Sequence, residues 1–136
     1  MGRIPEVKAF LIADTVLQEK GSNKWSVIGI FDRVWSHAYP TARPTVGIYV
    51  KLADARGTYR IAIEFRNAKD ERLARLDAPP LVAPPEATTL DFGIQTPPLP
   101  IPAPGRYHLV LFIDDELAQM VPIEAVKMDP PPGMRS

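Results

Sequence analysis

The chain has 136 residues, of which 46% are hydrophobic and 24% are charged. This length suits one domain around a single core, and the composition is that of a folded protein rather than a disordered or membrane-embedded one. Sixteen Lys and Arg residues balance sixteen Asp and Glu residues, so no long-range positive field favours nucleic acid or an anionic membrane.

The N-terminal residues 1–14 predict neither a secretory signal nor a membrane anchor. They contain no apolar run of the length that a signal requires and no small-residue cleavage site. No stretch of the chain approaches the ~18 consecutive apolar residues of a membrane-spanning helix. The sequence also has no cysteine, which excludes disulfides and thiolate chemistry. We therefore predict a cytoplasmic protein without a membrane partner.

The first two apolar segments predict a β-hairpin. Residues 6–14 (EVKAFLIAD) and 23–34 (NKWSVIGIFDRV) are rich in β-branched and aromatic residues. Gly21, Ser22 and Asn23, at the end of the stretch that joins them, can form the turn.

Several predicted strands are apolar on both faces. A two-layer sandwich buries only one face of each sheet, so the second apolar face needs cover from a loop, from a proline-rich crossing or from another protein. The residues assigned to this uncovered outer face are Phe10, Ile12, Ile28, Ile30 and Phe112.

The segment 31–44 (FDRVWSHAYPTARP) follows the second of these strands. Trp35 is expected to pack over the outer apolar face. Tyr39 and Arg43 are expected to make surface contacts, because aromatic and arginine side chains combine a large contact area with directed polar groups.

The middle of the chain alternates apolar and polar residues with a period of two. Residues 46–52 and 90–94 each carry such a stripe, and in residues 57–67 the side chains of Tyr59 and Phe65 bound another. Residues 71–78 add a short strand after a turn at 68–70. The sixteen prolines cluster between these stretches, where they predict stiff, extended connections.

The last two predicted strands form a second hairpin, and both are rich in residues that favour β-structure. Residues 105–113 (GRYHLVLFI) and 117–126 (LAQMVPIEAV) flank an acidic turn at 114–116. Tyr107 follows a glycine at the start of a late strand, which is where sandwich domains tie a strand to a loop through the phenol hydroxyl. Pro122 lies inside a strand and therefore predicts an edge position or a bulge.

These elements predict an all-β fold. About eight strands, with turns at intervals of about ten residues and no crossover helix, favour an antiparallel β-sandwich of immunoglobulin-like architecture; a closed barrel is the alternative. We assign residues 1–127 to this single domain and residues 128–136 to a flexible, proline-rich tail.

The sequence offers no local catalytic or metal-binding motif. It has no G-x-S-x-G elbow, no H-E-x-x-H and no glycine-rich phosphate loop. His37 and His108 are far apart and have no companion histidine at ligand spacing. We therefore predict no enzymatic activity and no cofactor or metal. A hydrolase that uses Asp32 and His37 is a distant alternative.

Two stretches carry a resemblance to a known family. The segment IGIFDR (28–33) and the hairpin GRYHLVLFIDDE (105–116) resemble a family of small bacterial proteins known only as a domain of unknown function, across roughly residues 6–126. The resemblance implies a sandwich fold of immunoglobulin type. It implies no reaction, cofactor or catalytic residue.

The function predicted from the sequence is that of a non-catalytic interaction or assembly module. Its partner would be a second copy of the chain or another protein, bound through an apolar outer sheet face. The alternative is a small-ligand or carbohydrate-binding domain that uses Trp35 and Tyr39 as a stacking platform and Arg43 for orientation. The predicted interface residues are Phe10, Ile12, Ile28, Ile30, Trp35, Tyr39, Arg43 and Phe112.

Overall fold

The structure is a computed structural model that describes residues 4–86 and 89–129. These parts of the chain form thirteen strands and no helix, so the predicted all-β class is confirmed. The strands are β1 (Glu6–Gln18), β2 (Trp25–Ile30), β3 (Arg33–Ser36), β4 (Thr41–Arg43), β5 (Gly47–Ala53), β6 (Gly57–Tyr59), β7 (Ile61–Asn67), β8 (Arg72–Asp77), β9 (Leu81–Ala83), β10 (Leu90–Gln95), β11 (Leu99–Ile101), β12 (Gly105–Ile113) and β13 (Glu116–Lys127).

The number of strands exceeds the eight expected, because short strands form in the connections. Eight strands have six residues or more, whereas β3, β4, β6, β9 and β11 have three or four. The short strands pair mainly with one another, as β11 with β4 and β6 with β9. Residues 130–136 of the predicted tail lie outside the described residues.

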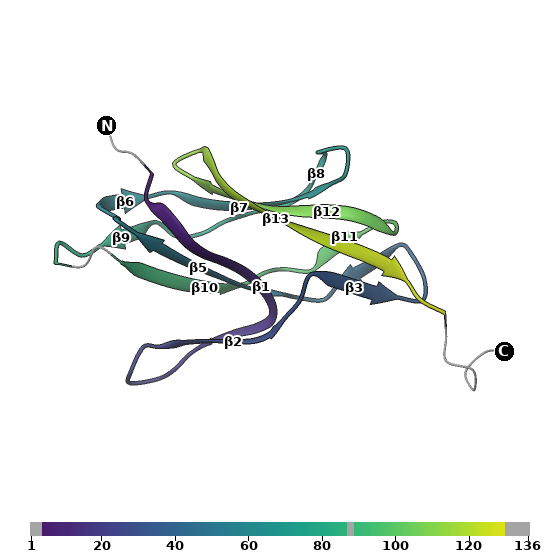
Figure 1. Ribbon diagram of the computed structural model, residues 1–136, viewed down its shortest axis with the longest axis horizontal. Helices are drawn as coiled ribbons and strands as arrows, with labels where there is room; N and C mark the ends of the chain where they lie inside the picture. The colour runs from purple at the N-terminus through teal and green to yellow at the C-terminus, as the bar shows by residue number, and fades with distance from the viewer. Residues whose placement is uncertain (1–3, 87–88, 130–136) are drawn as a thin grey trace.

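Two main sheets face each other across the core (Figure 1). The first sheet has the strand order β10-β5-β1-β2 and the second has the order β3-β13-β12-β7-β8. All pairs are antiparallel, as predicted, except that β3 pairs with β13 in parallel. No helix long and apolar enough to span a membrane occurs in the described parts of the chain.

Alternating side chains of both sheets fill the space between them. On β5, Ile48, Val50 and Leu52 are fully buried, and Leu109 and Leu111 of β12 approach the core from the other sheet. This is the burial that the period of two predicts, with one face of each strand in the core.

Phe10 and Ile12 also belong to this core, which corrects their assignment to the outer face. They are only 6% and 5% exposed, and they stand opposite Val50 and Ile48 of β5. The register of β1 shifts between Val7 and Ala9. Such an irregularity interrupts the strict alternation of faces, so simple counting along the strand fails there.

The hairpin of β12 and β13 has the turn chemistry that its sequence predicts. Asp114 and Asp115 have φ angles of 51° and 65°, as the two central residues of a type I′ turn require. The Tyr107 hydroxyl donates to the Ala103 carbonyl at 2.6 Å and accepts from the Ala103 amide at 3.2 Å. The structural role predicted for Tyr107 is therefore confirmed.

Pro122 occupies the edge position predicted for it. In β13, only Glu124–Lys127 pair with β3, so the stretch around Pro122 pairs with β12 alone among the described strands. A proline there needs no amide hydrogen bond on its second side.

Candidate functional site

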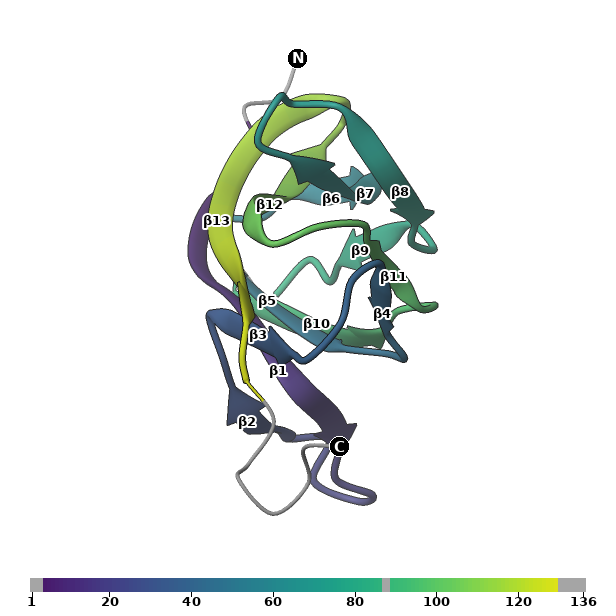
Figure 2. The same ribbon diagram turned by 90° about the vertical axis from the view of Figure 1, so that its right-hand side faces the viewer.

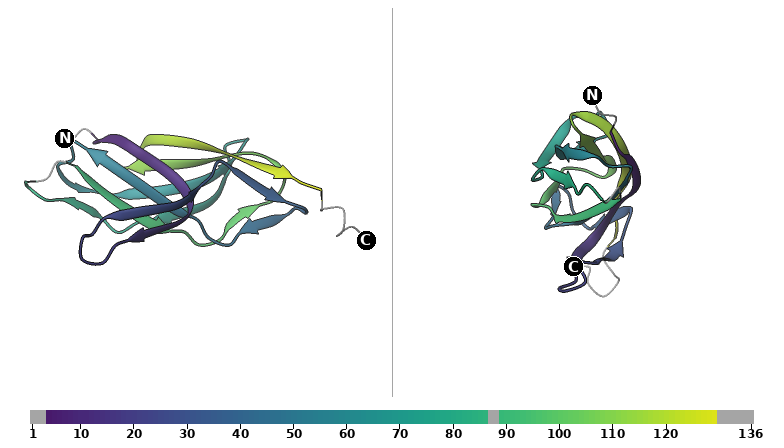
Figure 3. Two further views of the ribbon diagram at one scale, coloured as in Figure 1. Left: turned by 60° about the horizontal axis from the view of Figure 1, so that its bottom comes forward. Right: turned by 90° about the vertical axis from the view of Figure 1, so that its left-hand side faces the viewer.

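The second half of β1 and the whole of β2 form a hairpin that leaves the plane of the first sheet. Ala13 is the last residue of β1 to pair with β5, where it stands opposite Gly47. Beyond it, the Val16 amide donates to Oε1 of Gln95 on β10, at 2.8 Å. The hairpin thereby lies across the outer face of β5 and β10 (Figure 3, left), and Figure 2 shows it projecting beyond the two sheets.

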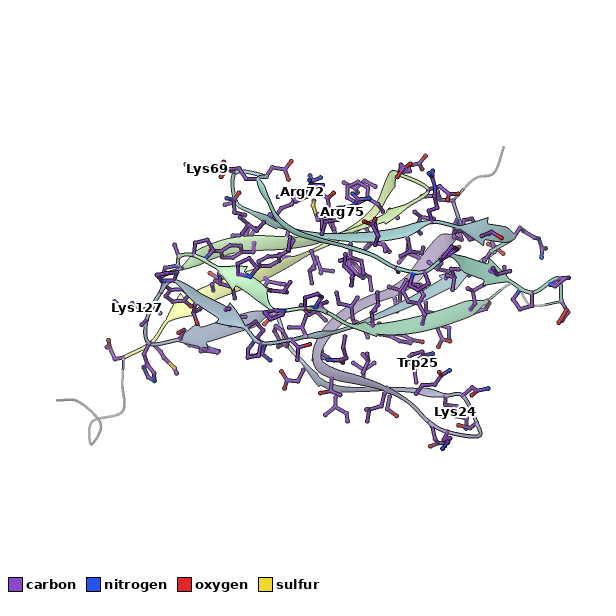
Figure 4. The ribbon with its side chains drawn as sticks, turned by 180° about the vertical axis from the view of Figure 1, so that it is seen from behind. Lys24, Trp25, Lys69, Arg72, Arg75 and Lys127 are labelled. Carbon is purple, nitrogen blue, oxygen red and sulfur yellow. The ribbon has the colours of Figure 1, made fainter. Side chains whose placement is uncertain are left out.

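The inner side of this hairpin packs against two glycine residues, Gly47 of β5 and Gly93 of β10. A Cβ atom on Gly47 would lie 2.6 Å from the Val16 amide nitrogen, and one on Gly93 would lie 2.7 Å from Cζ3 of Trp25. Figure 4 shows Trp25 between the hairpin and the neighbouring sheet. The two glycines allow this close approach, because any larger residue would push the hairpin away.

The outer side of the hairpin carries three large aliphatic side chains that point to solvent. Leu17, Ile28 and Ile30 are 50%, 53% and 62% exposed. Ile28 stands opposite Thr15, and Leu17 opposite Ser26, so these residues share the face that is turned away from Trp25. We call Leu17, Ile28 and Ile30 the apolar stripe.

The strand that carries most of this stripe is also a sheet edge without a charged residue. Among the described strands, β2 pairs only with β1. Its sequence WSVIGI contains no charged residue. The other edges of the main sheets each carry at least one charge: RVWS in β3, RLARLD in β8 and LDFGIQ in β10. Charges of this kind normally hinder edge-to-edge pairing, and β2 lacks them, although the positive φ of Gly29, 74°, interrupts its extended backbone.

Tyr39 and Arg43, predicted to make surface contacts, instead form contacts within the molecule. The Tyr39 hydroxyl donates to the Val126 carbonyl at 2.8 Å. The guanidinium of Arg43 lies 4.5 Å from the ring centroid of Phe31 and pairs with Asp14. Both residues therefore fasten segment 37–44 to β13 and to the hairpin.

Trp35 remains exposed, which corrects its expected role as a cover for the apolar face. It is 53% exposed on β3, where it stands opposite Val126. Strand β3 follows β2 after only two residues, so Trp35 lies close along the chain to Ile30.

Phe112 lies on a different surface from the apolar stripe. It stands opposite Ala62 of β7, on the outer face of the second sheet, and the Arg66 guanidinium lies 5.5 Å from its ring centroid. The eight predicted interface residues are thus divided among the core, the hairpin, segment 31–44 and this outer face. Of the eight, only Ile28 and Ile30 lie on the apolar stripe; Leu17, which belongs there too, was not predicted from the sequence.

A buried glutamate with three arginine partners occupies the outer face of the second sheet. Glu64 is 4% exposed. Its carboxylate accepts bonds from Arg66 and Arg75, each as short as 2.6 Å, and from Arg72 at 3.4 Å; Figure 4 shows Arg72 and Arg75 on this side. Burial opposes the charge, but the arginine hydrogen bonds outweigh it and lower the pKa of Glu64 below its usual value. The carboxylate is fully used in this network, which makes a structural role the best account of it.

Two cavities in the described part of the chain are small and mainly apolar. The larger has a volume of about 240 Å³ and is lined by residues such as Pro79, Pro80, Leu81 and Phe92. Another, beside Pro97 and Pro98, has about 90 Å³. Ligand sites for drug-sized molecules typically measure about 300–1,000 Å³, so neither space is a built site for a ligand of that size.

Asp32 and His37, the two residues considered for hydrolysis, contact different parts of the backbone. The Asp32 carbonyl accepts from the Glu124 amide at 2.9 Å, and Nδ1 of His37 lies 3.1 Å from the Met128 carbonyl oxygen. Across residues 4–86 and 89–129, no hydrogen bond joins the two side chains, and no group of three or more His, Asp or Glu residues is placed to hold a metal ion.

Comparison with known proteins gives a family but no activity. Residues 8–126 match the model of the Family of unknown function DUF6941. The chain belongs to this family. The membership predicted from the two sequence stretches is thereby confirmed, and the match covers nearly the predicted range. No curated protein matches the chain. Among solved structures, the chain is similar to an immunoglobulin-like protein from Pseudomonas aeruginosa, with 13% identity, a TM-score of 0.43 and coverage of 91% of this chain and 98% of that one.

Proposed function

We propose that this DUF6941 member is a non-catalytic protein-interaction module that binds through β2. One observation carries the proposal. Three large aliphatic side chains are at least half exposed on a hairpin whose outer strand is an uncharged sheet edge. Exposed apolar side chains scattered singly need no explanation, but a stripe that coincides with an open edge offers both burial and hydrogen bonding to a partner.

Burial of the apolar stripe alone does not supply the binding free energy of a micromolar complex, so backbone pairing along β2 must contribute as well. Full burial of a Leu or Ile side chain is worth about 1.5–3 kcal/mol, so covering the exposed halves of Leu17, Ile28 and Ile30 supplies roughly 3 kcal/mol in total. A micromolar complex needs about 8 kcal/mol. The backbone pairing of a strand added along β2, with its flanking contacts, would have to supply the remainder.

The carbohydrate-binding alternative has less support. A stacking platform of Trp35 and Tyr39 with Arg43 needs all three side chains at one accessible place. The hydroxyl of Tyr39 donates a hydrogen bond to the Val126 carbonyl. The Arg43 guanidinium lies over the Phe31 ring and pairs with Asp14. Only Trp35 of the three is largely exposed, which leaves one aromatic surface and no orienting group.

A photo-crosslinking experiment tests the proposed surface. A benzophenone amino acid replaces Ile30 in one variant and Val82 in a control, because both residues are 62% exposed and Val82 lies on β9, away from the hairpin. In extract of the native host, we expect a discrete cross-linked adduct from position 30 that excess unlabelled wild-type chain suppresses and excess Ile28→Lys chain does not. Equal adducts from both positions, or none from position 30, would contradict the proposal.

A further inference from the structure

We propose that the open side of the sandwich, between the edges of β8 and β10, binds the linear aliphatic chain of a small molecule. The site consists of the two apolar cavities described above. It lies apart from the apolar stripe on the hairpin, so the proposal goes beyond the interaction through β2, and either one can fail without the other.

The two cavities lie one after the other along the space between the sheets. Three segments line both of them, and on each segment the residues of the smaller cavity follow directly on those of the larger. Since a strand rises about 3.3 Å per residue, the lining residues of β7 alone span roughly 13 Å. We call the two cavities together the seam groove. Its segments are β7, with Ile61 and then Ile63 and Phe65; β8 and its extension, with Ala78 and then Leu76 and Ala74; and β10 and its extension, with Ile94 and then Thr96.

The lining of the seam groove suits hydrocarbon. Among the described residues that line the larger cavity, the side chains are aliphatic, aromatic or proline, and Gly93 has none. The smaller cavity has two polar lining residues, and both have partners within the protein. The Arg75 guanidinium contacts Glu64 and Asp77, and the Thr96 hydroxyl accepts from the Val46 amide at 3.3 Å. A polar ligand group would therefore lose water here without gaining a side-chain partner.

Prolines at the rim favour a hydrocarbon over a peptide strand. Pro79 and Pro80 lead into β9, and Pro97 and Pro98 precede β11. Figure 2 shows β9 and β11 between β8 and β10 on this side of the molecule. Proline has no amide hydrogen, so a peptide laid along either pair would find no donors for its carbonyls. An aliphatic chain needs none.

The volumes fit a single short chain. An apolar cavity of about 150 Å³ is large enough to bind benzene, and the larger cavity here has about 240 Å³. The smaller, of about 90 Å³, would hold the end of the chain. The chain has a route from solvent, because Pro79 and Pro80 are exposed while Ile61 beneath them is only 2% exposed.

Isothermal titration calorimetry of the full chain with 1-hexanol, 1-octanol and 1-decanol tests the proposal. Each added CH₂ that enters the groove should tighten binding by roughly three- to four-fold, the ratio that corresponds to burial of one methylene. Decanoate should bind about as tightly as 1-decanol, since the head group stays in water. Binding that depends on the carboxylate would contradict recognition through the chain.

Two substitutions fill the seam groove at different points. Ala78→Leu fills the larger cavity and should weaken the binding of every alcohol by roughly ten-fold or more, the equivalent of two excluded methylenes. Ala74 stands opposite Phe65 in the smaller cavity, so Ala74→Leu should spare 1-hexanol and remove the additional affinity of 1-decanol. Ala68→Leu, at an exposed position in the β7–β8 turn, is the matched control and should change none of the affinities.

Three results would overturn the proposal: no saturable binding of any of the three alcohols, an affinity that does not depend on chain length, or equal losses in Ala68→Leu and Ala78→Leu. If Ala78→Leu fails to fold, Ala74→Leu decides, because unfolding would abolish 1-hexanol binding as well. None of these measurements involves the apolar stripe, so they are separate from the photo-crosslinking test of the proposed function.

Discussion

Trp25 lies so close to Gly93 that any side chain at position 93 would collide with its indole. A Cβ on Gly93 would come within 2.7 Å of Cζ3 and 2.9 Å of Cε3 of the ring. The Cγ2 atom of Val16 would be the third neighbour, at 3.0 Å. The hairpin that exposes the apolar stripe is thus positioned by a glycine on another strand.

Gly93→Ala is expected to displace the hairpin and destabilise the protein. Overpacking of this kind typically costs about 1–3 kcal/mol, measured by urea unfolding. In a Trp25→Leu background the indole is absent, so the same Gly93→Ala change should cost much less. Equal costs in both backgrounds would show that the effect does not pass through Trp25.

Tyr107→Phe should destabilise the protein by about 1–2 kcal/mol, because it removes a hydroxyl with two hydrogen bonds to Ala103. The ring itself should stay in place, since it stacks on Phe65 with a centroid separation of 5.2 Å. Tyr39→Phe is the control, because among the described residues its hydroxyl makes a single hydrogen bond, to the Val126 carbonyl. Thermal or urea unfolding of the two variants should show the larger loss for Tyr107; the reverse order would contradict this account.

Those parts of the structure that depend on local pattern were predictable from the sequence. The alternation in 46–52 and 90–94 gives strands with one buried face, and the glycine, tyrosine and acidic turn residues mark the last hairpin. These features follow from backbone geometry and from the period of two. They do not depend on which residues distant in the chain pack together.

The outer-face assignments failed where packing depends on residues distant in the chain. Phe10 and Ile12 belong to the half of β1 that faces the core, whereas Leu17 belongs to the half that crosses the outer side of β5 and β10. The sequence pattern does not distinguish an apolar residue in the first half of β1 from one in the second half. The glycines at 47 and 93 are the one sequence signal for the crossing, and only the fold shows that they face Val16 and Trp25.

The β12–β13 turn should gain stability from glycine at position 115 and lose stability from alanine at position 114. Asp115 has a φ of 65°, a conformation that glycine adopts without strain, and its ion pair with Arg60 is largely exposed and worth little. Asp115→Gly is expected to raise the free energy of unfolding by a few tenths of a kcal/mol. Asp114→Ala should lower it by about 1–2 kcal/mol, because Oδ1 of Asp114 accepts the Arg60 amide. Equilibrium unfolding in urea measures both, and a loss of stability in the glycine variant would contradict the first.

Glu64→Gln should destabilise the protein at neutral pH and much less in acid. The carboxylate accepts charged hydrogen bonds from Arg66 and Arg75, so its loss is expected to cost about 1–3 kcal/mol at pH 7. Because the pKa of Glu64 is lower in the folded chain than its usual value of 4.5, this stabilisation is complete above that value and disappears as the pH falls through the lower, folded pKa. The stability difference between wild type and Glu64→Gln, from urea unfolding between pH 7 and pH 3, should therefore shrink as the pH falls below 4.5. Glu116→Gln, at an exposed position on β13, is the control for the substitution itself, and it should change the stability at pH 7 by no more than about 0.5 kcal/mol. A difference that stays constant down to pH 3 would show that Glu64 contributes through packing rather than through its charge.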